Sequence, residues 1–186
     1  MNLLAKTVFI LRTPRLVLVQ TPLELILRRL KQDDFYAPLN LGSGAVPVHF
    51  TPGWPGDALG FFAAWAEWKA AHPLEVEFGG GTVVHALEHV AIGQLGFKGP
   101  PNESGSVEVG FGFHPDYWRQ GYATEMVCAQ VDWALEQAGV YRVVADCLST
   151  NAGSIRVLEK CSFTQTGERW DDDEGGLLLL WERLKV

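Results

Sequence analysis

Residues 118–125 read WRQGYATE, and they separate two segments of different periodicity. The run VEVGFGF at 107–113 alternates like a strand, whereas apolar residues recur at helical spacing between Ala123 and Ala138. A glycine at this junction leaves the first N–H groups of the helix bare, and such groups attract anions. Two interpretations stay open here: an ordinary strand-to-helix turn, or a seat for a phosphate to which Arg119 adds charge.

A second helix start also carries polar side chains. The segment NAGSIRVLEKC at 151–161 follows a strand-like run at 141–148, and Asn151 and Ser154 share one face of its first turn. Capping and solvent exposure account for these two residues equally well. If the strands at 107–113 and 141–148 are neighbours, the two helix starts lie side by side at the carboxyl ends of the strands, where α/β sheets bind ligands.

The other segments predict an α/β chain with a mixed sheet and a single domain over residues 1–186. Thr21 and Pro22 are typical of a helix start, with Thr21 as the cap. Residues 38–56 hold four of the ten prolines and are expected to form a loop. The expected strands lie at 14–20, 82–88, 90–97, 107–113, 141–148, 162–170 and 176–184, and the expected helices at 21–32, 58–71, 122–138 and 151–161.

The composition, with 47% hydrophobic and 20% charged residues, is typical of a soluble globular protein. The net charge of -7 argues against a nucleic-acid-binding surface and is compatible with a cationic substrate such as an amine. No apolar run approaches the ~20 residues that cross a bilayer, and the N-terminal patch does not resemble a signal peptide, so a cytoplasmic location is expected. Cys128, Cys147 and Cys161 form no CxxC pair, and their apolar surroundings predict small buried side chains rather than a disulfide framework.

Three stretches carry a resemblance to a known family: IGQLGFKG at 92–99, VEVGFGFHPDYWRQGYATEM at 107–126 and STNAGSIRVLEKCSF at 149–163. In this order and spacing, the chain resembles the GNAT superfamily of acetyl-CoA-dependent N-acetyltransferases, and more narrowly the ribosomal-protein N-terminal acetyltransferases (Rim type). The resemblance runs from TPRLVL near residue 13 to the last strand. It implies a GNAT-type fold: a central mixed, mostly antiparallel sheet of about six or seven strands, with flanking helices and splayed central strands that bind acetyl-CoA.

The resemblance also implies which residues bind acetyl-CoA. The pyrophosphate loop of the family corresponds to residues 118–123, where Gly121 and Ala123 match the pattern and Trp118 stands where Gln or Arg is usual. Asn151 and Ser154 match a later motif that contacts the pantetheine arm. WRQGYATE is therefore best interpreted as a cradle for the pyrophosphate. The implied cofactor-binding residues are Phe111, Gly112, Phe113, Trp118, Arg119, Gln120, Gly121, Tyr122, Ala123, Thr124, Asn151 and Ser154.

Acetyl transfer to an amine needs a base, a stabilised oxyanion and a proton for the leaving thiolate. Glu108 lies on the strand that leads to this pyrophosphate-binding turn. Similar enzymes carry a glutamate there, and Glu108 is the expected base. The alternative role for Glu108 is a strand carboxylate that only holds the substrate cation. A backbone N–H near Phe113 is expected to stabilise the oxyanion. Leu158 replaces the tyrosine acid of many GNAT enzymes, so Ser154 or water is expected to deliver the proton.

Other polar and aromatic candidates have simpler interpretations. His85 and His89 stand four apart in strand sequence and do not predict a metal site. His114 is a second candidate base, although an ordinary loop histidine is the simpler interpretation. The rings of Phe61, Phe62, Trp65 and Trp68 follow helical spacing. We expect them either to pack in the core or to line the acceptor site.

The sequence therefore predicts an N-acetyltransferase that moves an acetyl group from acetyl-CoA to a primary amine by direct transfer, since no cysteine is placed as an acyl carrier. The nearest analogue of the acceptor is a protein N-terminal amine. A small amine, such as an amino acid, a polyamine or an aminoglycoside, is the alternative acceptor. A non-catalytic acyl-CoA-binding sensor is the alternative class of protein. The chain is expected to be a monomer or a homodimer without a metal.

Overall fold

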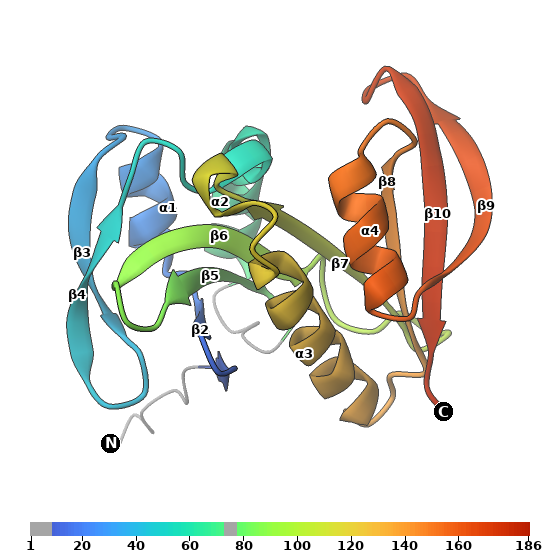
Figure 1. Cartoon of the computed structure of the whole chain (residues 1–186), viewed down its shortest axis with the longest axis horizontal. Coiled ribbons are helices and arrows are strands. Elements are labelled where there is room, and N and C mark those ends of the chain that lie inside the picture. Colours follow the sequence, from blue (N-terminus) through green and yellow to red (C-terminus); the bar gives the residue numbers. More distant parts are fainter. Residues whose placement is uncertain (1–8, 73–77) are drawn as a thin grey trace.

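Ten strands of the described residues, 9–72 and 78–186, form one mixed sheet in the computed structural model (Figure 1). The strands are β1 (Ile10–Arg12), β2 (Leu16–Gln20), β3 (Phe35–Asn40), β4 (Ala45–Phe50), β5 (Gly80–His85), β6 (Val90–Phe97), β7 (Ser106–Phe113), β8 (Arg142–Leu148), β9 (Thr164–Asp171) and β10 (Gly176–Leu184). The helices are α1 (Leu23–Arg29), α2 (Phe62–Ala71), α3 (Tyr122–Glu136) and α4 (Ala152–Lys160), with short 3-10 helices η1 (Gly56–Phe61) and η2 (Pro115–Tyr117). The sheet order is β1-β2-β5-β6-β7-β8-β10-β9, with the hairpin β3–β4 attached to β6. This arrangement confirms the predicted α/β class.

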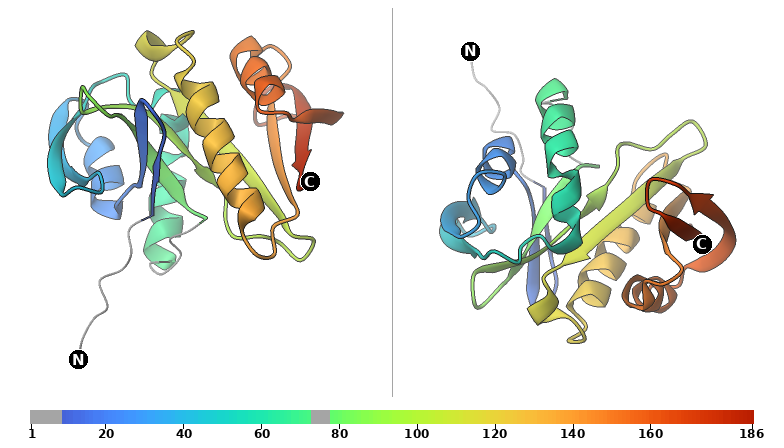
Figure 2. Two further views of the ribbon diagram at one scale, coloured as in Figure 1. Left: turned by 60° about the horizontal axis from the view of Figure 1, so that its bottom comes forward. Right: turned by 90° about the horizontal axis from the view of Figure 1, so that it is seen from above.

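The sheet has a core on each face because its inner strands carry apolar residues in both directions. In β2, Leu16 and Leu18 belong to the core that includes residues of α3 and α4. Val17 and Val19 belong to the core that includes residues of α1 and α2. Figure 2 shows α2 and α3 on opposite sides of the strands. The unbroken run LVLV is therefore a strand that is buried on both faces.

Strands β7 and β8 run parallel only at their beginnings. Residues 106–108 pair with residues 142–144, and the register ends there. Beyond this point β7 continues against β6, and β8 continues against β10. The two strands are neighbours, which was the condition for the helix starts to lie side by side, but their carboxyl ends diverge (Figure 1). This divergence is the splayed arrangement of central strands that the family resemblance implies.

The prediction of a loop over residues 38–56 is wrong for its first part, where β3 and β4 form a hairpin. Pro38 and Pro47 lie opposite each other in this hairpin. Proline lacks the N–H that a central strand needs, but an edge hairpin tolerates it, and β4 reaches β6 only through His49 and Val90. This hairpin and β1 raise the number of strands to ten, above the six or seven expected.

The helix starts follow the sequence signals only in part. Thr21 does not cap α1, because its hydroxyl lies 2.8 Å from the Thr82 hydroxyl in the buried contact between β2 and β5, and Pro22 is the N-cap residue. Asn151 does cap α4, as predicted, since its side-chain oxygen accepts from the Ser154 N–H at 3.0 Å. The expected helix at 58–71 is η1 followed by α2.

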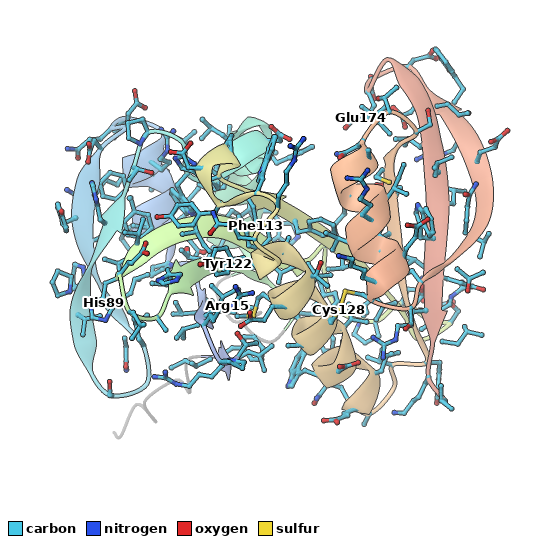
Figure 3. The ribbon with its side chains drawn as sticks, viewed as in Figure 1. Arg15, His89, Phe113, Tyr122, Cys128 and Glu174 are labelled. Carbon is cyan, nitrogen blue, oxygen red and sulfur yellow. A yellow bond between two sulfur atoms is a disulfide. The ribbon has the colours of Figure 1, made fainter. Side chains whose placement is uncertain are left out.

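The prediction for the cysteines is wrong for two of the three. Cys128 of α3 and Cys161, which follows α4, form a disulfide that joins residues 33 apart in sequence (Figure 3). The pairing depends on the packing of α3 beside α4, which the spacing of the cysteines does not reveal. Cys147 is free and buried, as predicted.

None of the helices within residues 9–72 and 78–186 combines the length and apolar character needed to cross a bilayer. The N-terminal apolar patch considered above lies mainly in residues 1–8, outside the described residues.

Candidate functional site

Helix α3 begins at a turn with left-handed backbone conformations. Gly121, its N-cap residue, has φ 82° and ψ 1°, and Arg119 has φ 59°. The Glu125 N–H donates to the Gly121 carbonyl at 2.9 Å, so residues 122–124 precede the first helical bond, and their N–H groups have no helix carbonyl to bond. The N-cap residue is a glycine and has no side chain that could accept a hydrogen bond from these groups. Together with the helix dipole, free amides at a helix start can bind an anion.

The strand before this turn has backbone groups that lack a partner strand on one side. The His114 N–H donates to β6 at 2.8 Å, and the Glu108 carbonyl accepts from the residue after β6 at 2.9 Å. Alternate residues of an antiparallel pair bond the same neighbour, so the even-numbered residues of β7 bond the β6 side. The N–H groups of Phe111 and Phe113 therefore turn towards β8, which has diverged at this level. An extended ligand can pair with these groups.

Two glycines of β7 shape the face of the sheet on which the Glu108 side chain lies. A Cβ on Gly112 would lie 3.1 Å from the Ala58 nitrogen and the Pro55 carbonyl oxygen, so the glycine allows η1 to approach β7. A Cβ on Gly110 would meet no atom within 4 Å. Because alternate residues share a face, this open space lies on the same side of β7 as the Glu108 side chain.

Glu108 forms an ion pair with Lys98, whose backbone lies opposite on the β6 side. Asp146 lies on the same face of the sheet, since Glu108 pairs with Val144 and Asp146 is two residues further along β8. Burial lowers the pKa of Lys98, but the bond and charge of Glu108 outweigh it, with smaller contributions from Asp146 and Glu174, and the pKa is raised. The predicted base is therefore already bound to a cation of the chain.

Two of the predicted loop side chains stabilise the turn itself. The Trp118 indole N–H donates to the Phe113 carbonyl at 2.7 Å, and the Gln120 amide donates to the Asp116 carbonyl at 2.9 Å. Arg119 is exposed. The backbone amides of the turn are therefore better placed for a ligand than the side chains of Trp118 and Gln120.

The start of α4 contributes fewer free groups. The Asn151 side-chain oxygen is engaged by the Ser154 N–H, and Ser154 is partly buried in the first turn. Leu158 is fully buried, so the position at which the resemblance implied a possible tyrosine acid is part of the core here. The Cys128–Cys161 disulfide joins this helix to α3 and holds the two helices together.

His85 and His114 both have hydrogen-bond partners within the protein. His85 Nδ1 accepts from the Glu88 N–H at 3.3 Å, and His85 Nε2 lies 3.2 Å from the Tyr122 hydroxyl. His114 Nδ1 accepts from the Asp116 N–H at 3.1 Å. In the part of the chain that the structure describes, no three or more His, Cys, Asp or Glu side chains are grouped to hold a metal ion.

The sequence reasoning missed a set of contacts between the segment before β2 and the start of α3. The Thr13 hydroxyl and the Arg15 N–H donate to Glu125 Oε1 at 2.6 and 3.0 Å, and Arg15 Nε lies 2.6 Å from Oε2 (Figure 3 shows Arg15 beside Tyr122). Glu125 is the available signal, because a carboxylate beside a bound anion would repel that anion unless a cation of the chain compensated it. The sequence does not indicate which cation this is.

A sequence model of the acetyltransferase (GNAT) domain matches residues 24–164. The chain belongs to the GNAT acetyltransferase family. The uncharacterized N-acetyltransferase YjdG of Bacillus subtilis (strain 168) is 36% identical over 81 residues, which are 44% of this chain and 48% of that protein. The chain thus spans about half the length of this curated relative.

Solved structures share the GNAT fold at low sequence identity. The ribosomal-protein-S5-alanine acetyltransferase from Vibrio fischeri has a TM-score of 0.63 at 18% identity, covering 95% of this chain and 97% of the other. The spermidine N-acetyltransferase from Vibrio cholerae, in complex with CoA and spermine, has a TM-score of 0.57 at 15% identity, covering 67% and 75%. The predicted GNAT site residues, from Glu108 to Ser154, all lie within the matched range, whereas Thr13 and Arg15 precede it.

Proposed function

We propose that this chain is an acetyl-CoA-dependent N-acetyltransferase that acetylates a primary amine by direct transfer. The observation that carries the proposal is the left-handed conformation of Gly121, the N-cap residue of α3, which leaves the first N–H groups of the helix unpaired. This helix start follows β7, whose pairing with β8 ends at residue 108. Under this proposal residues 1–186 form one catalytic domain that acts in the cytoplasm without a metal, as a monomer or a homodimer.

The residues present fit acetyl-CoA. The amides of residues 119–124 and the positive end of α3 would hold the pyrophosphate, because they offer donors and partial charge to an anion. The backbone of residues 111–113 would pair with the pantetheine arm, and the first turn of α4, with Asn151 and Ser154, would flank it. When bound, acetyl-CoA supplies the acetyl group as a thioester whose thiol, with a pKa near ~8.5, leaves readily.

Glu108 is the proposed base. Its carboxylate lies on the face of β7 where Gly110 leaves open space, so an amine placed there can pass its proton to Glu108 directly or through water. The Phe113 N–H, which turns towards the diverged β8, is the proposed donor to the developing oxyanion. Ser154 or water returns a proton to the departing thiolate, since the buried Leu158 offers none.

The state of the cysteines supports direct transfer. Cys128 and Cys161 are bonded to each other and have no free thiol. Burial raises the pKa of the Cys147 thiol, which keeps it protonated and weakly nucleophilic at neutral pH. An acyl-cysteine intermediate is therefore disfavoured.

The charges beside Glu108 favour an acceptor that is a cation. Asp146 and Glu174 both act on Lys98, and Asp146 also meets Arg169 at 3.7 Å. Arg169 also pairs with Asp171 at 3.2 Å. Four carboxylates therefore accompany two cations, which leaves negative charge for an ammonium group. A protein N-terminal amine is the first proposed acceptor, and a polyamine, as in the complex of the Vibrio cholerae spermidine acetyltransferase, is the second.

The test combines binding and turnover. Acetyl-CoA should raise the melting temperature of the protein by mass action, and free thiol should appear with an amine from a panel of peptides and polyamines. Stabilisation without thiol release from any acceptor favours the non-catalytic sensor, which has no need for a carboxylate at position 108. A melting temperature that saturating acetyl-CoA leaves unchanged contradicts the proposal.

A further inference from the structure

Arg15 makes several contacts with the turn that opens α3, although it lies 105 residues from Gln120 in sequence. Its Nη1 donates to the Gln120 carbonyl at 3.0 Å, and its Nε lies 2.6 Å from Glu125 Oε2. The guanidinium carbon lies 4.3 Å above the centre of the Tyr122 ring. Arg15 Nη2 is the nearest atom to the position that a Cβ on Gly121 would take, at 3.4 Å. One side chain thus contacts the carbonyl before Gly121 and the first turn after it.

The bond to the Gln120 carbonyl selects one of two orientations of a peptide group. The φ and ψ of Gly121, 82° and 1°, are those of the third residue of a type II turn. Rotation of the peptide between Gln120 and Gly121 would convert the turn to type I, and glycine accepts both conformations at little cost. In a trans peptide the carbonyl and the following N–H point in opposite directions, so a carbonyl held by Arg15 turns the Gly121 N–H away from Arg15. The flipped peptide would present a carbonyl oxygen where the turn now presents an amide.

Arg15 also neutralises the one acidic side chain in the first turn of α3. Burial raises the pKa of Glu125, but the bonds from Thr13 and Arg15 and the charge of Arg15 outweigh it, and the pKa is lowered, so Glu125 is a carboxylate. An uncompensated carboxylate here would repel a phosphate at the helix start. The Arg15–Glu125 ion pair removes this repulsion.

We propose that Arg15 is a positioning residue of the phosphate-binding turn: it fixes the Gln120–Gly121 peptide in the orientation that offers an N–H to the pyrophosphate of CoA. This inference rests on the proposed function. Arg15 acts through the backbone of the turn and through Glu125, from the segment between β1 and β2, which precedes the range matched by the GNAT family model.

Arg15→Met tests the inference against Arg28→Met. Arg28 is a matched control, because it also lies over an aromatic ring, Phe35 at 4.4 Å, and donates to a carbonyl, that of Tyr36 at 3.0 Å, away from α3. In calorimetry, Arg15→Met should raise the Kd of CoA about tenfold, because a charge-assisted bond is lost and the Glu125 carboxylate loses its counter-ion. Arg28→Met should leave the Kd unchanged. Arg15→Lys keeps the charge but loses the planar guanidinium with its several N–H donors, so its Kd for CoA should lie between those of wild type and Arg15→Met.

A substrate without the pyrophosphate separates positioning of the turn from general structural damage. With acetyl-CoA, Arg15→Met should raise KM about tenfold and leave kcat unchanged, whereas kcat/KM with S-acetylpantetheine should equal that of wild type. Equal losses with both thioesters, or an unchanged Kd for CoA, would overturn the inference. A wild-type protein that binds CoA but releases no thiol would refute the proposed catalysis, and the calorimetric comparison would still decide the role of Arg15. A wild-type protein that binds no CoA would overturn both.

Discussion

The ammonium group of Lys98 lies against the carboxylate of Glu108, the group that we propose accepts the proton of the acceptor amine. Lys98 therefore occupies Oε1 of the carboxylate that an incoming ammonium group would also bind. Both side chains are partly exposed, so the ion pair is weak enough to be exchanged for a substrate cation.

Glu108→Gln removes the base without changing the size of the side chain. We expect kcat to fall by about 100-fold or more, while the Kd for CoA stays at the wild-type value, because Glu108 points away from the backbone groups that face β8. Glu182→Gln is the matched control, since Glu182 is also a strand carboxylate in an ion pair, with Arg142 at 3.4 Å. Steady-state kinetics and calorimetry provide the two readouts. Equal activity of the two variants would exclude Glu108 as the base.

Lys98→Met removes the competing cation. The KM for the amine should fall by a factor of about 1.4 to 5, since an exposed ion pair contributes about 0.2–1 kcal/mol, and the KM for acetyl-CoA should not change. Arg142→Met, which removes the other cross-strand ion pair, should leave both constants unchanged. A higher amine KM in Lys98→Met would show that Lys98 assists the acceptor instead of competing with it.

Gly121→Ala tests the left-handed turn at the start of α3. A Cβ at φ 82° costs about 1–2 kcal/mol of folding free energy, and the variant should also bind CoA more weakly. Gly139→Ala places the same strain at φ 80°, after the end of α3, where a Cβ would meet no atom within 4 Å. Urea unfolding should show similar losses for both variants, and calorimetry should show weaker CoA binding for Gly121→Ala alone. Equal CoA affinities of Gly121→Ala and Gly139→Ala would show that the turn at Gly121 does not bind the cofactor.

The Cys128–Cys161 disulfide should stabilise the folded chain by about 3.7 kcal/mol, because it closes a loop with a sequence separation of 33 in the unfolded state. Guanidinium unfolding with and without dithiothreitol measures this difference. The double variant Cys128→Ser/Cys161→Ser should be as unstable as the reduced protein and insensitive to dithiothreitol. A wild-type midpoint that the reductant does not move would show that the bond contributes nothing to stability.

Tyr117 should make stability depend on pH in the alkaline range. Burial and the carboxylate of Glu88, whose Oε2 accepts from the Tyr117 hydroxyl at 3.2 Å, raise the pKa of Tyr117 from 10.0 to about 12. A raised pKa means that the contribution is complete below pH 10.0 and is lost as the pH rises towards 12. The difference in unfolding free energy between wild type and Tyr117→Phe should therefore be constant at neutral pH and decrease across this window. A difference that does not change up to pH 12 would contradict the assignment.

Local sequence signals correctly predicted the helices and strands that are marked by the periodicity or the capping residues of their own segment. The alternation in VEVGFGF, the helical spacing after Gly121 and the cap formed by Asn151 each depend on residues within a few positions of one another. The same signals failed at Pro38 and Pro47, because proline is typical of loops and also of edge hairpins, and only the attachment of β4 to β6 distinguishes the two.

Local patterns in the chain were sufficient to predict the strand–turn–helix unit around Gly121, the position of Glu108 on the strand before it, and the family to which both belong. The tertiary structure alone decided that Lys98 reaches Glu108, that Cys128 meets Cys161 and that Arg15 binds the Gln120 carbonyl. Backbone conformation and capping are local properties that the chain encodes within one or two turns. Ion pairs and disulfides between distant segments depend on how strands and helices pack, which no local pattern specifies.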